Sequence, residues 1–144
     1  MPDPDIQLRK FQKELSSGTV SLALLAVLDH ADTPMYGYQI AKRLEQLEGV
    51  LAGKQSALYP VLRGLEAATL LDSHVEPSVA GPPRRYYRIT AEGRRVLGLW
   101  AHAWRATRDS VDAVLGPLAA HAANAASGLT SSPTEPTDSR GPTA

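Results

Sequence analysis

The 144-residue chain contains no cysteine, which excludes a disulfide framework, a thiolate nucleophile and a cysteine-based zinc site. Its four histidines are scattered, without the i, i+4 spacing of a metal-binding helix: His30, His74, His102 and His121. The sequence also lacks a glycine-rich phosphate loop and a serine in a nucleophile elbow. We therefore expect no enzyme, cofactor or metal site, and the missing cysteine fits a reducing cytoplasm.

An excess of charge and a long apolar segment are also missing. The 15 basic and 15 acidic side chains cancel, so overall charge argues neither for nor against nucleic acid. The most apolar run, residues 20–28, is too short to cross a bilayer, and no signal-peptide pattern precedes it. We therefore expect no membrane partner. Residues 127–144 are dominated by small and polar types and should be disordered, because they can bury too little surface.

Positive charge is nevertheless concentrated locally. Seven arginines and a single acid, Glu92, lie between residues 84 and 108. Such a cationic strip suits a partner that presents phosphate over a limited footprint. A solvated helix face is the simpler explanation for four of the seven: Arg94, Arg95, Arg105 and Arg108.

Hydrophobic periodicity predicts four helices in the first half of the chain. They are expected at residues 6–15, 19–31, about 36–47 and 55–68. The first carries Leu8, Phe11 and Leu15 on one face and should end where Gly18 breaks the pattern. The second is apolar nearly all round, which is typical of a helix buried at the centre of a domain.

A strand hairpin is predicted next, from Leu71–Glu76 and residues 84–90 around the turn sequence AGPP at 80–83. Strand alternation separates two sets of side chains, Arg85, Tyr87 and Ile89 from Arg84, Tyr86 and Arg88. Ile89 and Tyr87 should belong to the core, whereas Arg84 and Tyr86 should face outward. Arg85 lies close enough to the tip to swing toward phosphate. A helix followed by a basic hairpin is the arrangement of a winged helix-turn-helix, in which the hairpin touches DNA backbone.

The last helix should begin at Ala91, with Thr90 as its cap, and it should kink or end at Gly116-Pro117. Its apolar positions alternate at spacings of three and four: Leu97, Trp100, Trp104, Thr107, Val111, Val114 and Leu118. This spacing is that of a coiled-coil seam and predicts a homodimer, supported by Leu8, Phe11 and Leu15 of the first helix. The alternative, a seam packed within its own domain, is less favoured because the upstream helices already fill that core.

The predicted fold is therefore mainly α (α+β), a winged helix-turn-helix with a two-stranded wing and a long C-terminal dimerisation helix. Its expected parts are an N-terminal helix with a dimer contact (1–17), a winged-helix DNA-binding domain (18–92), a dimerisation helix region (93–126) and a disordered tail (127–144).

The helix at 55–68 presents Gln55, Ser56, Tyr59 and Arg63 opposite its leucines. Glutamine can pair with adenine, serine can bond a base or a phosphate, and a tyrosine hydroxyl suits a phosphate. Ser56 could equally well be a helix N-cap, and Arg63 could simply be solvated. Trp100 and Trp104 could sandwich a flat aromatic ligand across a two-fold axis or serve only as dimer contacts, and the sequence favours neither.

Several segments together resemble the PadR family of bacterial transcriptional regulators, in its short form with one C-terminal helix. They are MYGYQI at 35–40, ALYPVL at 57–62, GPPRRYYRIT at 81–90 and the Trp100/Trp104 pair. The similarity extends over about residues 8–118 and departs from the family pattern at Lys54-Gln55-Ser56. It implies that the wing arginines and the Tyr36/Tyr38 turn lie beside DNA phosphates, and that some short members bind planar, often cationic compounds at the dimer interface.

We therefore expect a cytoplasmic homodimer that binds a palindromic double-stranded DNA operator, most simply a repressor relieved by a planar aromatic effector. The predicted DNA contacts are Tyr36, Tyr38, Lys54, Gln55, Ser56, Tyr59, Arg63, Arg84, Arg85 and Tyr86. Trp100 and Trp104 are the predicted effector contacts. The alternative is a winged-helix module that binds another protein and lacks specific DNA binding.

Overall fold

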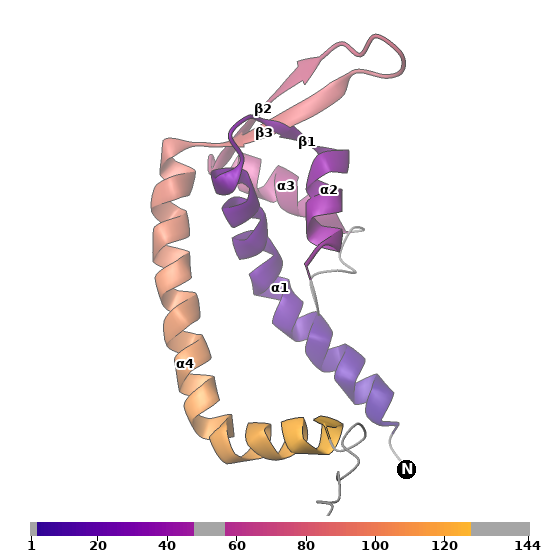
Figure 1. The fold of residues 1–144 in the computed structure, drawn as a ribbon. Coiled ribbons are helices and arrows are strands. Elements are labelled where there is room, and N and C mark those ends of the chain that lie inside the picture. The colour runs from indigo at the N-terminus through magenta and orange to yellow at the C-terminus, as the bar shows by residue number, and fades with distance from the viewer. Residues whose placement is uncertain (1–2, 48–56, 128–144) are drawn as a thin grey trace, which may run out of the picture. The chain divides into compact units, whose positions relative to one another are not determined.

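The computed structural model describes residues 3–47 and 57–127, with side chains placed as far as residue 117. The elements follow in the order α1 (Pro4–His30), β1 (Met35–Tyr36), α2 (Gly37–Glu45), α3 (Leu58–Ala67), β2 (Leu71–Glu76), β3 (Arg84–Ile89) and α4 (Ala91–Ser127) (Figure 1). Two compact units divide the chain, residues 1–104 and 105–144. The predictions for Lys54, Gln55 and Ser56, and for the tail beyond residue 127, fall outside the described residues.

Helix α1 is continuous over 27 residues, so the predicted break at Gly18 is wrong. Asp3 caps the helix by accepting a hydrogen bond from the Asp5 amide at 3.0 Å. A glycine inside a helix costs only about 1 kcal/mol, which cannot outweigh the packing of the apolar turns that follow it. Those turns bury Val20, Leu24 and Leu25 in the core.

The sheet has three antiparallel strands in the order β1-β3-β2, one more than predicted. Strand β1 pairs Met35 with Tyr87 and Tyr36 with Tyr86, on the free edge of β3. Two residues are too few to show an alternating pattern, so this strand exists only because the tertiary fold brings it to the hairpin. The hairpin itself is as predicted, with Leu71 opposite Ile89 and Glu76 opposite Arg84.

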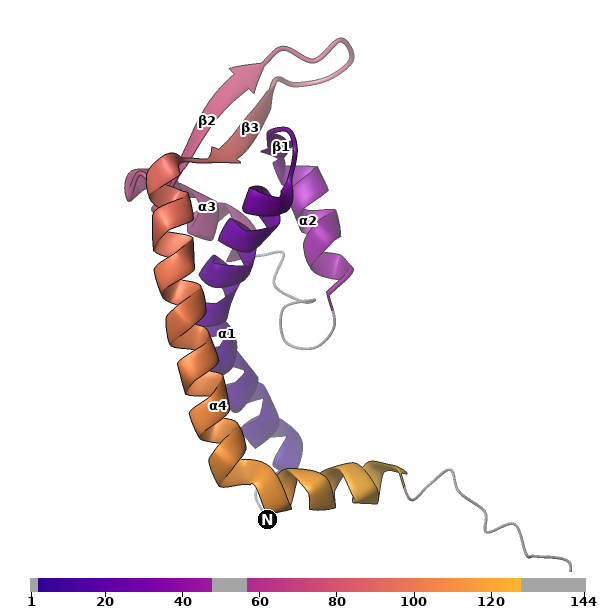
Figure 2. The same ribbon diagram turned by 60° about the vertical axis from the view of Figure 1, so that its left-hand side comes forward.

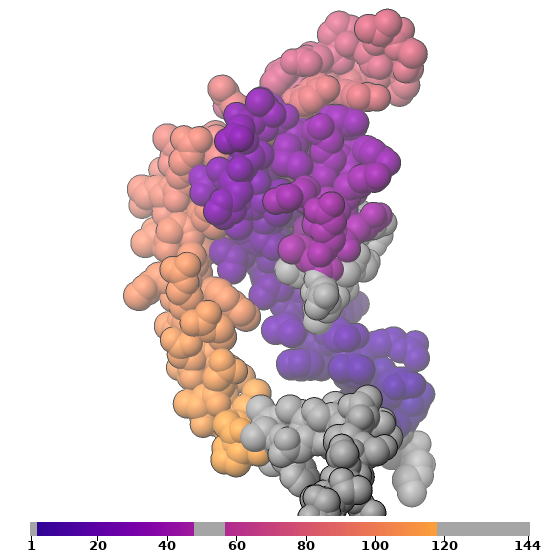
Figure 3. All heavy atoms as spheres, viewed as in Figure 1, coloured from indigo at the N-terminus to yellow at the C-terminus, as the bar shows by residue number. Residues whose placement is uncertain are grey.

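The core lies where α1, α2 and α3 meet the base of the hairpin. Its fully buried side chains are Leu24, Leu25, Ile40, Leu44, Leu58, Leu62 and Leu71. Tyr87 and Ile89 are 4% and 6% exposed, which confirms the predicted inner face of β3. The outer half of the hairpin projects beyond α1, α2 and α3 (Figures 1 and 3).

Thr90 joins the hairpin to α4 and caps the helix as predicted. Its hydroxyl oxygen accepts a hydrogen bond from the Gly93 amide at 2.9 Å and donates toward the carbonyls of Thr69, at 2.7 Å, and Leu70, at 3.1 Å. Gly93 packs so tightly that a methyl group there would overlap the Leu70 carbonyl oxygen. The first turn of α4 is therefore fixed directly to the strand hairpin.

Helix α4 does not end at Gly116-Pro117, because Pro117 lies inside it. The ribbon instead changes direction in its C-terminal part (Figure 2), the other outcome expected of an internal proline. Among the described residues, no helix combines the length and apolarity needed to cross a membrane.

The predicted seam of α4 is divided. Leu97 and Trp100 are partly buried against the core of their own chain, so for them the less favoured alternative, packing within the domain, is the observed one. Farther along, Trp104, Val111 and Val114 are 38%, 49% and 81% exposed. The side chain of Leu118 is outside the described residues. The later part of the seam is therefore the more exposed part, and Leu97 and Trp100 keep part of their surface exposed.

Candidate nucleic-acid interface

Helix α3 turns one face to the core and the other to solvent. Leu58, Leu62 and Leu65 are buried, whereas Tyr59 is 53% exposed and Arg63 is exposed. Ala57 occupies the N-cap position of α3, and the alternative in which Ser56 caps this helix falls outside the described residues. The base-reading roles predicted for Gln55 and Ser56, and the contact from Lys54, remain predictions.

The Tyr-Gly turn at the start of α2 packs against α3. The Tyr36 amide donates a hydrogen bond to Gln39 Oε1 at 3.1 Å, which fixes the first turn of α2. A methyl group on Gly37 would approach the Tyr59 hydroxyl to 2.5 Å. A glycine is therefore required for Tyr59 to lie across the beginning of α2. Tyr38 is 59% exposed beside this contact, with the Lys42 ammonium 5.2 Å from its ring centroid.

The outer face of the wing carries a row of aromatic rings. Tyr86 stacks on His74 at 5.6 Å between ring centroids and meets the edge of Tyr36 at 5.5 Å. The Arg84 guanidinium lies 4.5 Å from the centroid of the Tyr36 ring. Arg84 is exposed as predicted, but Tyr86 is half-buried because the neighbouring rings cover it. Strand β1 thus brings three predicted contacts, Tyr36, Arg84 and Tyr86, into one cluster.

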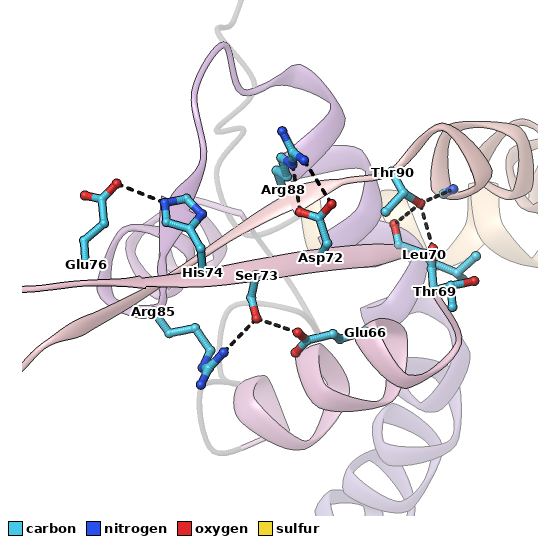
Figure 4. Close-up of polar contacts among 11 residues, drawn as sticks. Glu66, Thr69, Leu70, Asp72, Ser73, His74, Glu76, Arg85, Arg88 and Thr90 are labelled. Carbon is cyan, nitrogen blue, oxygen red and sulfur yellow. Dashed lines mark hydrogen bonds and ion pairs between the residues drawn. The ribbon is translucent and has the colours of Figure 1, made fainter.

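The inner face of the wing lies toward α3. Arg85 Nη1 donates a hydrogen bond to Ser73 Oγ at 2.9 Å, and Ser73 Oγ donates to Glu66 Oε1 at 2.5 Å (Figure 4). Arg85 therefore faces the crevice between the hairpin and α3. Burial, followed by the charge of Glu66, raises the pKa of the Tyr87 phenol in the same crevice.

Arg88, on the outer face of the wing, is paired with a carboxylate. It donates two hydrogen bonds to Asp72, at 2.7 and 3.2 Å, and this contact lowers the pKa of Asp72. Three residues around these contacts were not predicted from the sequence: Lys42, Ser73 and Glu66. The hairpin register would have placed Ser73 beside β3, but the approach of Glu66 depends on how α3 packs and leaves no signal in the sequence.

A helix with an exposed polar face, followed by an antiparallel hairpin with exposed cationic side chains, defines a winged helix-turn-helix DNA-binding protein. Residues 24–99 match the family of PadR-like transcriptional regulators. This match covers more than half of the chain, and the chain belongs to that family. PadR regulators bind DNA, which favours DNA binding over the protein-interaction module. The members of this family are regulators of transcription.

Known structures agree with this assignment. A PadR family transcriptional regulator from Eggerthella lenta is 33% identical, with 77% of this chain matched to 94% of that chain at a TM-score of 0.64. A PadR family regulator from Clostridium difficile is 27% identical, with coverages of 68% and 99% and a TM-score of 0.56. An uncharacterised protein from Lysinibacillus sphaericus is 27% identical over 78 residues, which cover 54% of this chain and 72% of that protein.

Proposed function

We propose that this PadR-family protein is a repressor that binds a palindromic operator as a homodimer and releases it when a planar ligand binds. The observation that carries the DNA-binding part is the pairing of the exposed α3 face with arginines on both faces of the wing. The proposed DNA contacts are Tyr36, Tyr38, Tyr59, Arg63, Arg84, Arg85 and Tyr86, and Lys54, Gln55 and Ser56 complete the set.

Exposed apolar side chains support dimerisation. Leu8 and Phe11 of α1 are 52% and 58% exposed, and Leu15 is 39% exposed. Trp104 and Val111 of α4 are exposed as well. Large apolar side chains of this kind mark association surfaces on soluble proteins. The proposed interface comprises Leu8, Phe11, Leu15, Leu97, Trp100, Trp104, Thr107, Val111, Val114 and Leu118, with Leu97 and Trp100 at its edge.

The dimer is tested by Trp104→Glu, which would bury an unpaired carboxylate at a cost of several kcal/mol. Sedimentation should show a dimer for the parent chain at micromolar concentration and a monomer for the variant. Arg105→Ala, an exposed position outside the proposed interface, is the control and should remain dimeric. A monomeric parent chain at that concentration would contradict the proposal.

A two-fold dimer presents two recognition helices to successive major grooves, about 34 Å or a multiple of that apart. The operator should therefore be an inverted repeat with a half-site spacing of one or more helical turns. A footprint on the DNA upstream of the protein's own gene tests this directly. Protection of a single, unrepeated site would contradict the palindromic operator.

Wing and helix contacts should differ in kind. Arg84→Ala should weaken binding about equally on operator and scrambled duplexes and lower the slope of log K against log salt by about 0.9. Gln55→Ala should instead reduce operator discrimination by about 1–3 kcal/mol with little change in slope. Identical behaviour of the two variants in salt titrations would refute this division, and Arg105→Ala should leave both quantities unchanged.

The effector part rests on Trp100 and Trp104, the two tryptophans of the chain. Indole faces attract planar cations by about 0.5–2 kcal/mol. Titration with planar cationic dyes should therefore quench tryptophan fluorescence saturably, and the same dye should weaken operator binding, because coupling between two sites is reciprocal. Quenching with unchanged operator affinity would refute the effector role, as would a panel in which no dye binds.

A further inference from the structure

The crevice between α3 and the inner face of the wing is a hollow of about 440 Å³ into which charged side chains reach. Its walls are Tyr59, Arg63 and Glu66 from α3, with Arg85 and Tyr87 from β3. Two arginines and a tyrosine hydroxyl suit one phosphate, but a carboxylate lies among them. The arrangement therefore requires an explanation of how Glu66 and Arg85 avoid neutralising one another.

Ser73 separates the two charges. Its hydroxyl donates to Glu66 at 2.5 Å and accepts from Arg85 at 2.9 Å, so that this one oxygen atom lies between the carboxylate and the guanidinium (Figure 4). Within the described part of the chain, Arg85 forms no ion pair and uses one N–H in this contact. A guanidinium has five N–H groups, so the others remain available to a ligand.

The opposite face of the same hairpin shows the contrasting case. There Asp72 pairs in register with Arg88 and engages it through two hydrogen bonds without a spacer. Figure 4 shows the two contacts on opposite sides of the hairpin. Two arginines of β3 thus differ in their surroundings: Arg88 is paired with a carboxylate, whereas Arg85 keeps most of its N–H groups available.

We propose that Ser73 holds Glu66 away from Arg85, so that Arg85 and Arg63 form a seat for one backbone phosphate of DNA in the crevice beside α3. Ser73 is a positioning residue, and Glu66 lowers affinity by its charge. This inference rests on the proposed DNA-binding function and names the part of the wing that carries it. The raised pKa of Tyr87, to which Glu66 contributes after burial, supports a carboxylate charge that reaches the hollow.

Three variants test the proposal in salt titrations with a labelled duplex from upstream of the gene. Ser73→Ala should let Glu66 pair directly with Arg85 and remove one phosphate contact. Affinity at 0.1 M salt should fall about eightfold and the slope by about 0.9, the same as in Arg85→Ala. Glu66→Gln keeps an oxygen acceptor for Ser73 but removes the charge, and should tighten binding about twofold.

The decisive measurement is the double variant Ser73→Ala/Glu66→Gln. Without a carboxylate to capture Arg85, its affinity and slope should return to at least the parent values. A merely structural role of Ser73 would give no such rescue. Ser110→Ala, which removes an exposed hydroxyl bonded to the Ala106 carbonyl, is the matched control and should not change binding.

A salt-dependence slope that Ser73→Ala leaves unchanged would overturn the inference, as would a double variant that binds DNA as weakly as Ser73→Ala. The Arg84→Ala variant would still test whether the wing contacts DNA phosphate at all. Loss of salt-dependent binding in the parent chain would overturn the proposed function as well. Calorimetry with inorganic phosphate distinguishes the source of the anion. No saturable binding is expected, and saturable binding that Arg85→Ala abolishes would assign the seat to free phosphate instead of DNA.

Discussion

Replacing Gly93 by alanine should destabilise the fold, although alanine is the better helix former. Gly93 lies in the first turn of α4, where a methyl group would overlap the Leu70 carbonyl oxygen and approach Ile89 Cγ1 to 2.7 Å. The same carbonyl accepts hydrogen bonds from the Thr90 amide and hydroxyl, both at 3.1 Å. Any shift that relieves the overlap therefore strains the junction between hairpin and helix.

The magnitude follows from three contributions. Overpacking costs about 1–3 kcal/mol, and weakening two hydrogen bonds adds about 1 kcal/mol or more. Improved helix propensity returns about 1 kcal/mol. The net loss should be about 1–3 kcal/mol, a large part of the 5–15 kcal/mol by which a typical domain is stable.

Gly98→Ala is the matched control, because Gly98 lies in the same helix with nothing within 4 Å of the added methyl group. This variant should gain about 0.5–1 kcal/mol. Urea unfolding followed by circular dichroism, at one fixed protein concentration, measures both changes. Changes of the same sign in the two variants would refute the reasoning, as would a Gly93→Ala protein as stable as the parent.

Three further predictions concern single contacts. Thr90→Val should cost about 1 kcal/mol in urea unfolding through loss of the helix cap, and Thr90→Ser should restore most of it. Arg88 lowers the pKa of Asp72 below its usual 3.8, so this pair stabilises the fold above that pH and the contribution is lost as pH falls toward the folded-state pKa. Asp72→Asn should therefore cost less than about 1 kcal/mol at pH 7, because the pair is exposed, and nothing in urea titrations well below pH 3.8. Gly37→Ala should lower the free energy of DNA binding, measured in a filter assay, more than the free energy of unfolding. The exposed Tyr59 ring can move away from the methyl group at little cost to the fold, but it then leaves its proposed position beside DNA.

The two strands of the hairpin and the Thr90 cap could be predicted from local patterns. The alternation of β3 identified Tyr87 and Ile89 as core residues, and the position of Thr90 before a helical pattern identified the cap. The α4 seam was harder, because a spacing of three and four indicates an apolar stripe and does not say what covers it. Leu97 and Trp100 pack on their own core, while Trp104 is left partly exposed.

The sequence by itself determined the class of fold, the hairpin and its inner face, because these depend on periodicities that span only a few residues. Tertiary structure decided the features that join distant segments. These features are the pairing of β1 with β3, the continuation of α1 past Gly18, and the contact of Glu66 with Ser73, which also bonds Arg85. Such contacts depend on how helices pack against the sheet, and the packing free energy is shared among many side chains. No local pattern records it, so which arginine of the wing is neutralised and which remains available becomes visible only in three dimensions.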